Sequence, residues 1–175
     1  TTAYRFINRK DFSKDLVSKV MDELIAEGCG VIAASKTFGV DGMDEELLIK
    51  DLGKEKGIEV CAASEISKLY GLTRRTRTAV INGSILPRMI STADSTEDAV
   101  KKAGIEAPLM IMRGDGGVMD IEEMRNRPVL TMLSGPAAST VGALMYLRVS
   151  NGIFFEVGGT TTDIGVIKNG RPMID

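Results

Sequence analysis

The chain has 175 residues, of which 43% are apolar and 26% charged, and its net charge of −2 provides no basic field for nucleic acid or anionic lipid. Histidine is absent, which excludes Ser–His–Asp and Cys–His catalysis and every zinc site that uses histidine. The length is sufficient for one substantial domain or two small lobes with a hydrophobic core. Carboxylates, hydroxyls, lysine, arginine, backbone amides and a bound cation are left for chemistry.

Cysteine usage and hydropathy indicate a cytoplasmic protein that binds neither membranes nor nucleic acid. Cys29 and Cys61 form no CxxC motif and lie beside apolar residues, so we interpret both as buried free thiols. No apolar run approaches the ~20 residues that cross a bilayer, and no secretion signal opens the chain. Because the sequence begins with Thr1 and stops just after an expected strand pair, we expect a piece of a longer protein.

The first third of the chain has the pattern of a parallel α/β unit. Apolar residues recur with helical spacing over Ser13–Glu27 and Asp44–Lys56, and a glycine follows each run. Buried strands are expected over Gly30–Ser35 and Ile58–Ala62. Strand, helix, strand in this order implies parallel pairing with a right-handed crossover.

A long and mostly helical stretch is expected over Ser64–Lys102. Pro87 should bend or break it, and Ser91–Ser95 should interrupt it again. Four spare cations, three in this stretch and one directly after the first expected strand, are interpreted as solvated side chains on helix faces. They are Lys36, Arg74, Arg75 and Arg77.

A strand expected over Ala107–Met112 leads directly into Asp115-Gly116-Gly117. The carboxyl end of a strand in a parallel α/β sheet is the usual place for a ligand, so these three residues are candidates for cofactor binding. Asp115 as a simple turn residue is an equal alternative. Asp120 and Glu123 have capping-box spacing, which predicts a short helix ending at Asn126.

A further helix is expected from Ser134 to about Leu147, with Pro136 in its first position, where a missing N–H costs nothing. The unpaired N–H groups and positive dipole end of a helix N-terminus favour an anion. Ser134 and Gly135 are therefore candidate cofactor-binding residues. An ordinary capped helix is the alternative.

The last predicted unit is a pair of strands, Gly152–Val157 and Thr162–Lys168, joined by a turn at Gly158–Thr161. Its two glycines let the backbone approach an anion closely and direct N–H groups at it. The hydroxyls of Thr160 and Thr161 can donate to phosphate oxygens.

Two carboxylates flank this turn. Glu156 and Asp163 would repel phosphate unless a divalent cation lies between them, so we interpret both as metal ligands and catalytic carboxylates. A plain β-hairpin with a Gly-Gly turn is the alternative.

This hairpin resembles the second phosphate motif, D-x-G-G-T-x-x-D, of the actin/hexokinase/Hsp70-type ATPase superfamily. The order and spacing of several segments also resemble the hydantoinase/oxoprolinase family. These are RRTRTAVINGSILPRM (Arg74–Met89), RGDGGV (Arg113–Val118), RPVLTML (Arg127–Leu133), SGPAASTVGA (Ser134–Ala143) and EVGGTTTDI (Glu156–Ile164). By this resemblance Gly158, Gly159, Thr160 and Asp163 occupy phosphate-loop positions. Glu156 stands where the family usually has Asp, and Arg113-Gly114 stands where it tends to have Gln-Ser.

The resemblance implies an α/β fold made of the ribonuclease H-like lobes of actin/hexokinase-type ATPases, present here as an incomplete fragment. Residues 1–64 would end the N-terminal lobe, and residues 65–175 would begin the hydantoinase A domain. ATP and Mg²⁺ would be the cofactors and a small cyclic amide such as a hydantoin or 5-oxoproline the substrate. A second hydantoinase-type subunit and an oligomeric assembly are implied as partners. The helix at Ser134–Leu147 would connect the lobes through its small residues, namely Gly135, Ala137, Ala138, Gly142 and Ala143.

Other members of the superfamily supply alternatives. A chaperone-like or reactivating ATPase would use the same loop to drive lobe closure, a ketone carboxylase subunit would activate a different substrate, and a small-molecule kinase is a weaker alternative. The first phosphate loop and the adenosine segment of the superfamily are not found in the sequence. We therefore expect the 175 residues alone to be inactive and to bind ATP weakly or not at all.

Overall fold

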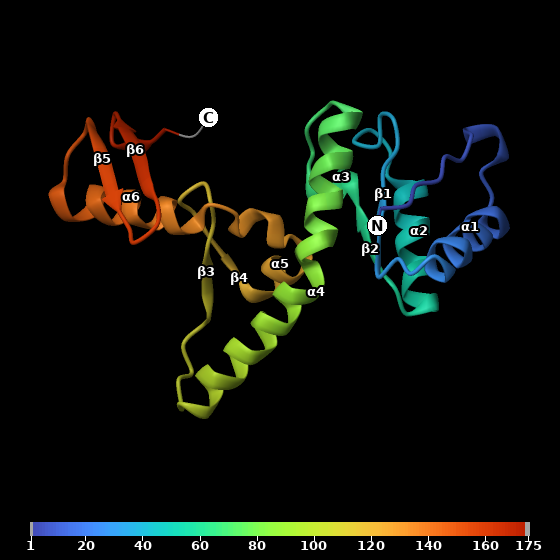
Figure 1. Ribbon diagram of the computed structural model, residues 1–175, viewed down its shortest axis with the longest axis horizontal. Coiled ribbons are helices and arrows are strands. Elements are labelled where there is room, and N and C mark those ends of the chain that lie inside the picture. Colours follow the sequence, from blue (N-terminus) through green and yellow to red (C-terminus); the bar gives the residue numbers. More distant parts are fainter. Residues whose placement is uncertain (1, 174–175) are drawn as a thin grey trace. The chain divides into compact units, whose positions relative to one another are not determined.

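The structure, a computed structural model, describes residues 2–173 and divides into two compact units, with the boundary between Pro87 and Arg88 (Figure 1). Its mixture of helices and strands confirms the predicted α/β class. Among the described residues no helix is long and apolar enough to cross a membrane. The predicted division after residue 64 stays a prediction.

Local sequence signals explain the helices of the first unit. Ser13 caps α1, because its Oγ accepts a hydrogen bond from the Leu16 N–H at 3.3 Å. Gly57 ends α2 in the left-handed conformation, with φ of 68°, which glycine adopts without strain. After a short 3₁₀ turn, Arg9–Asp11, the elements are α1 (Lys14–Ala26), β1 (Val31–Ala34), α2 (Asp44–Lys56), β2 (Glu59–Ala62) and α3 (Ala63–Ile66).

The two strands of this unit pair in parallel, as predicted, with Ile32 opposite Val60. One face of the pair packs on α1 and α2, where Val17, Met21 and Leu52 are buried. The N-terminal half of α4 covers the other face, because a Cβ built on Gly83 would lie 3.0 Å from Val31 Cγ1 and 3.6 Å from Cys61 Sγ. The sheet is therefore buried between two helical layers.

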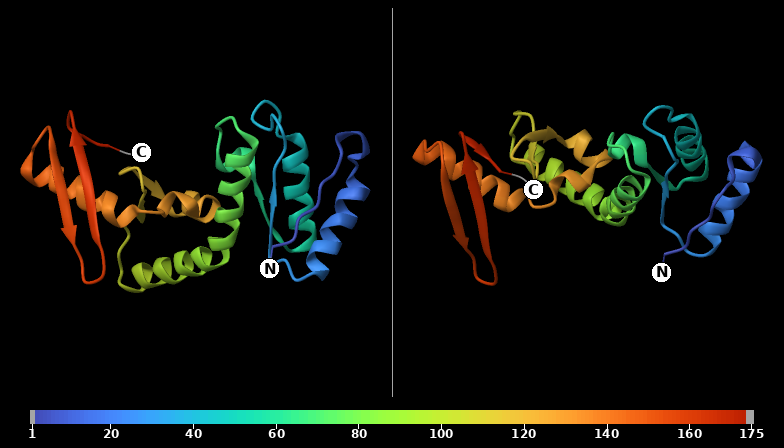
Figure 2. Two further views of the ribbon diagram at one scale, coloured as in Figure 1. Left: turned by 45° about the horizontal axis from the view of Figure 1, so that its top comes forward. Right: turned by 90° about the horizontal axis from the view of Figure 1, so that it is seen from above.

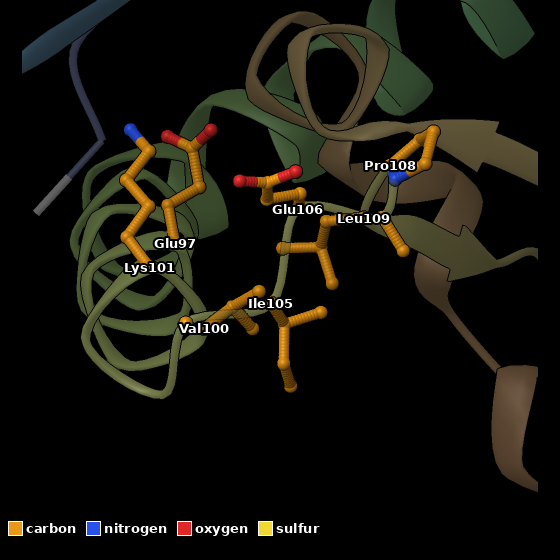
Figure 3. A pocket seen from close by; sticks show the side chains of 9 residues that line it. Glu97, Val100, Lys101, Ile105, Glu106, Pro108 and Leu109 are labelled. Carbon is orange, nitrogen blue, oxygen red and sulfur yellow. The ribbon is translucent and has the colours of Figure 1, made fainter.

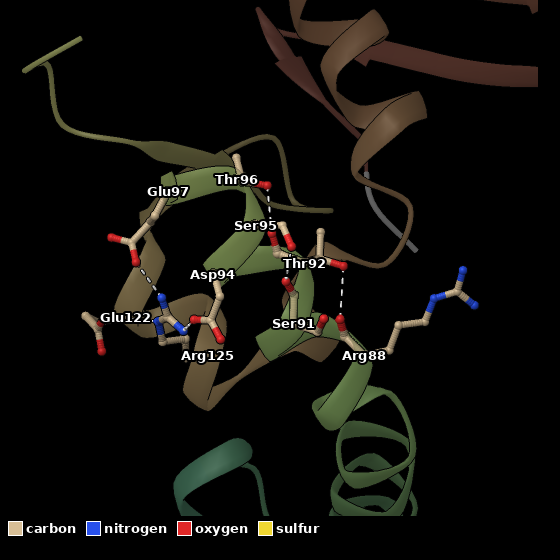
Figure 4. Close-up of polar contacts among 9 residues, drawn as sticks. All are labelled: Arg88, Ser91, Thr92, Asp94, Ser95, Thr96, Glu97, Glu122 and Arg125. Carbon is tan, nitrogen blue, oxygen red and sulfur yellow. Dashed lines mark hydrogen bonds and ion pairs between the residues drawn. The ribbon is translucent and has the colours of Figure 1, made fainter. Parts of the chain in front are cut away.

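The long helix α4 runs from Leu72 to Lys102 and continues through Pro87. The predicted second interruption at Ser91–Ser95 was wrong. In this stretch hydroxyls donate to the carbonyl four residues earlier, as Thr92 does to Arg88 and Ser95 to Ser91 (Figure 4). Satisfied in this way, hydroxyl-rich residues remain helical.

In the second unit β3 (Met110–Met112) and β4 (Val118–Asp120) form an antiparallel hairpin, followed by α5 (Ile121–Asn126) and a 3₁₀ turn at Pro128–Thr131. Asp120 caps α5 by accepting the Glu123 N–H at 2.7 Å, as its spacing predicted. The core of this part consists of Ala93, Met119, Ile121 and Met124.

An ionic cluster ties α5 to the C-terminal half of α4. The Arg125 guanidinium forms ion pairs with Asp94 and Glu97 on α4 and with Glu122 on α5 (Figure 4). The cluster raises the pKa of Arg125, with Asp94 as the largest cause.

The last part of the unit is α6 (Ser134–Leu147) and an antiparallel sheet of β5 (Gly152–Val157), β6 (Thr162–Lys168) and β7 (Arg171–Pro172), in the order β5-β6-β7. The helix packs against one face of the sheet (Figure 2). On the other face the apolar side chains are exposed, among them Ile153, Phe155 and Ile164. Within the described residues only one face of this sheet is covered.

Candidate functional site

The carboxylates at the two ends of the predicted phosphate loop are brought together by strand register. Glu156 on β5 pairs directly with Asp163 on β6, one step before the closing pair Val157 and Thr162. Side chains directly opposite each other in an antiparallel pair lie about 5 Å apart at their Cβ atoms. The hairpin thus provides two half-buried carboxylates on one face of the sheet.

That face is the one that α6 covers. Residues two apart on a strand share a face, so Asp163 lies on the same side as Gly165, whose missing Cβ would meet Thr140 of α6 at 2.6 Å. Oxygen donors of this kind suit Mg²⁺, which is commonly held by one or two carboxylates together with substrate phosphates and water. Among the described residues no group of three or more His, Cys, Asp or Glu side chains forms a metal site. Any cation here would therefore take its remaining ligands from outside these side chains.

The packing and backbone of this unit do not require glycine at position 159, and they constrain position 158 at one contact only. Neither Gly158 nor Gly159 has a positive φ, so neither position needs glycine for its backbone conformation. A Cβ on Gly159 would meet nothing within 4 Å, and one on Gly158 would meet only the Thr161 carbonyl oxygen, at 3.2 Å. The hairpin closes through the Gly158 N–H, which donates to that oxygen at 2.9 Å. Open space beside exposed glycines is what close approach of an anion requires.

The hydroxyls predicted to bind phosphate are accessible. Thr160 and Thr161 are both exposed at the end of the hairpin. Their placement permits donation to an anion resting on the loop, and their assignment as phosphate ligands stays a prediction.

The N-terminus of α6 differs from the prediction in one respect. Leu133 is the N-cap, in a left-handed conformation with φ of 59°, so Pro136 is the third helical residue rather than the first. Its missing N–H still costs nothing, because the first-turn N–H groups have no intrahelical partner. No side chain caps this end, and Ser134 and Gly135 begin the helix. Among the described residues a Cβ on Gly135 or Gly142 would meet nothing within 4 Å, so the close packing predicted for these two glycines does not occur within this part of the chain.

Asp115-Gly116-Gly117 does not follow a parallel strand, and that part of the prediction was wrong. It forms the turn between the antiparallel strands β3 and β4, and β4 was not predicted. The Asp115 carboxylate accepts the Gly117 N–H at 3.0 Å and pairs with Arg113. These contacts, the Gly117 N–H foremost, lower the pKa of Asp115. The structure supports the alternative of a turn residue.

The turn and the phosphate loop lie at different places on the unit. Gly116 approaches α6 and β7, since its Cβ would lie 3.1 Å from Val141 Cγ2 and 3.8 Å from Pro172 Cγ. Strand β7 pairs with Ile167 and Lys168, at the end of β6 away from the loop. Asp115 and its glycines therefore do not join Glu156 and Asp163 in a single site within this unit.

Sequence reasoning missed a buried polar network in the first unit. Arg75, interpreted as solvated, is only 1% exposed and donates to the carbonyl oxygens of Leu69 and Lys36 at 3.1 and 2.7 Å. Glu46 is also 1% exposed and accepts hydrogen bonds from the Lys36 N–H, the Ser64 N–H and the Ser64 hydroxyl. Both hold the loop after β1; Arg75 also holds the loop after α3, and Glu46 holds α3 itself at Ser64. No local pattern indicates their burial. Lys36 itself is half-buried and pairs with Glu45.

A surface pocket of about 470 Å³ lies beside the C-terminal end of α4 (Figure 3). Its lining includes the charged side chains of Glu97, Lys101 and Glu106 and the apolar side chains of Val100 and Ile105. None of the predicted site residues contributes to it, so it is separate from the hairpin site.

The sequence model of the family described as Hydantoinase/oxoprolinase matches residues 75–175, which is more than half of the chain. The chain belongs to this family. The matched region includes α6 and the β5–β6 hairpin, and therefore both carboxylates of the site.

Two curated relatives have similar sequences. An uncharacterized protein of Methanocaldococcus jannaschii is 29% identical over 120 residues, which is 67% of this chain and 18% of that protein. Caprolactamase subunit alpha of Pseudomonas jessenii is 29% identical over 115 residues, 64% of this chain and 16% of that protein. The match thus spans less than a fifth of the length of these curated relatives.

Two solved structures share the fold. The nucleotide-free structure of acetone carboxylase, from work on ATP-dependent acetone carboxylation, has a TM-score of 0.75 at 24% identity and covers 90% of this chain and 23% of its own. The ATP-dependent caprolactamase of Pseudomonas jessenii has a TM-score of 0.75 at 23% identity. The likeness covers 93% of this chain and 25% of the caprolactamase chain. At this identity the likeness establishes the fold alone.

Proposed function

We propose that this chain forms the second phosphate-binding hairpin of an ATP- and Mg²⁺-dependent enzyme that opens a cyclic amide. The observation that carries the proposal is the direct pairing of Glu156 with Asp163 across a hairpin whose two glycines are exposed and have no positive φ. Two opposed carboxylates beside an open glycine turn are suited to a cation and a phosphate together. In this proposal the fold is part of an actin/hexokinase-type ATPase lobe.

The chemistry follows from the stability of the substrate. An unstrained cyclic amide resists water, and transfer of a phosphoryl group to its oxygen activates it. The loop N–H groups and the hydroxyls of Thr160 and Thr161 would orient phosphate oxygens, while Glu156 and Asp163 would hold the cation. Mg²⁺, when bound, neutralises charge that develops on the transferring phosphate.

The relatives support this choice among the alternatives. One is named an ATP-dependent caprolactamase, and caprolactam is itself a cyclic amide. The curated caprolactamase relative is named a subunit alpha, which supports a second subunit in the enzyme that we propose. Acetone carboxylase supports the second candidate, an ATP-dependent ketone carboxylase subunit.

The test is ATP hydrolysis by the whole enzyme that contains this chain. We expect Mg²⁺-dependent turnover that rises with a hydantoin, 5-oxoproline or caprolactam, and a loss of about 100-fold or more in Asp163→Ala and Thr160→Ala. Asp98→Ala, at an exposed position on α4, is the matched control and should retain activity. Unchanged turnover in both loop variants would refute the assignment of the loop.

The choice of substrate separates the candidates. Stimulation by acetone with bicarbonate, but not by a cyclic amide, would favour the carboxylase. Stimulation only by a protein partner would favour a reactivating ATPase of the same superfamily.

A further inference from the structure

The contact between α6 and β6 is closer at one point than any side chain on β6 would allow. A Cβ built on Gly165 would lie 2.6 Å from Thr140 Oγ1 and 3.4 Å from Thr140 Cγ2, whereas real Cβ contacts essentially never fall below 3.0 Å. Gly165 does not have a positive φ, so its backbone conformation is open to any residue. Glycine at position 165 therefore allows α6 to pack closely against β6.

Thr140 cannot easily turn away from this contact. It is 6% exposed, and its hydroxyl donates to the Pro136 carbonyl oxygen at 2.9 Å. Its branched side chain has few accessible rotamers in a helix. A Cβ added at Gly165 would thus have to move the helix or the strand, or break this hydrogen bond.

The same contact lies next to the carboxylate pair. Gly165 pairs with Phe154, and Asp163 pairs with Glu156 one same-face step nearer the loop, about 7 Å along the strand. Both pairs face α6. The separation of helix and sheet at Gly165 therefore sets where the two carboxylates lie relative to α6.

A second side of α6 is also in close contact with the rest of the unit. Val141 follows Thr140 and points about 100° further round the helix, where Gly116 of the β3–β4 turn approaches its Cγ2. Close packing on two sides limits how far α6 can retreat from a larger residue on β6.

We propose that Thr140 and Gly165 are positioning residues that fix the Glu156–Asp163 pair for phosphate and cation binding. The inference rests on the proposed function of the hairpin and goes beyond it, because neither residue belongs to the phosphate motif. Gly165 allows α6 to come close to β6, and Thr140 is the α6 side chain that β6 packs against.

The primary test is Gly165→Ala in the whole enzyme. We expect kcat for ATP hydrolysis to fall about 10- to 100-fold and the Mg²⁺ concentration for half-maximal rate to rise, while KM for the amide substrate stays the same. Gly152→Ala is the matched control, because Gly152 lies on the same hairpin with open space at its Cβ and no positive φ. It should leave all three quantities unchanged.

The compensating variant is Gly165→Ala with Thr140→Ala, which removes the two Thr140 atoms that the new methyl group would meet and leaves only Phe154 Cδ1, at an ordinary 3.5 Å. We expect it to recover most of the activity lost by Gly165→Ala, measured against Thr140→Ala alone. The double variant also carries the test if Gly165→Ala fails to fold, because a relieved clash should restore both folding and turnover. A normal rate in Gly165→Ala, or no recovery in the double variant, would overturn the positioning role.

The variant Asp163→Ala distinguishes a failure of the positioning role from a failure of the proposed function. If Asp163→Ala abolishes turnover and Gly165→Ala does not alter it, only the positioning role fails. If Asp163→Ala has full activity, the hairpin is not the phosphate site and both proposals fail together.

Discussion

Glu156 and Asp163 lie directly opposite each other in the antiparallel pair of β5 and β6. Like charges directly opposite each other in an antiparallel pair are destabilising. A cation between them would reverse the effect. The pair therefore destabilises the hairpin when no cation is bound and stabilises it when one is bound.

A first prediction concerns the response of this pair to Mg²⁺. In Glu156→Gln the repulsion is lost, so the unfolding midpoint without metal should rise slightly, and Mg²⁺ should no longer raise it. The unsubstituted protein should be stabilised by Mg²⁺ in the same thermal unfolding measurement. Equal Mg²⁺ responses of the two proteins would contradict a cation site at the pair.

A second prediction separates the phosphate loop from a plain hairpin. Gly159→Ala meets no neighbour and needs no unusual φ, so the free energy of unfolding should stay the same or increase by about 0.4–1 kcal/mol. In the whole enzyme the added methyl group would obstruct the approach of phosphate, and we expect ATPase activity to fall at least about tenfold. Denaturant titration and turnover are measured on the same preparations. Normal turnover would favour the plain hairpin.

Elements whose signals are local could be read from the sequence. The Ser13 cap defines α1, and α2 occupies the predicted range Asp44–Lys56. The β5 and β6 strands also have the predicted bounds, because alternation and a Gly-Gly turn set both the strands and their register. The opposed carboxylates of the site follow from that register.

Features that depend on distant partners could not be read in this way. Strand β4 has three residues and only Met119 buried, too short for a period to appear. Arg75 is buried because carbonyl groups of two loops, one of them 39 residues away, converge on its guanidinium. The approach of Gly165 to Thr140 likewise exists only in the packed unit.

A third prediction tests the buried network around Glu46. Its two carboxylate oxygens accept three hydrogen bonds, so Glu46→Gln would place an amide N–H₂ against groups that are themselves donors. Unpaired buried donors cost about 1–3 kcal/mol each, and we expect a loss of that size in urea-induced unfolding. Glu55→Gln, at an exposed position on the same helix, should change the free energy of unfolding by less than about 0.5 kcal/mol. Equal stability of the two variants would show that the network contributes nothing.

A fourth prediction concerns pH and the turn at Asp115. The Gly117 N–H and the Arg113 guanidinium hold the pKa of Asp115 below its ordinary value, so the folded state binds its proton less readily than the unfolded chain does. The stabilisation is therefore fully present above the unfolded pKa of about 3.9 and is lost as pH falls through the lower folded value. Because the side chain is partly exposed, solvent screening keeps the contribution below about 1 kcal/mol. Asp115→Asn should be slightly less stable than the parent at pH 7, with the difference in unfolding free energy shrinking below pH 4. A difference that stays constant into the acid range would show that the charge of Asp115 does not stabilise the turn.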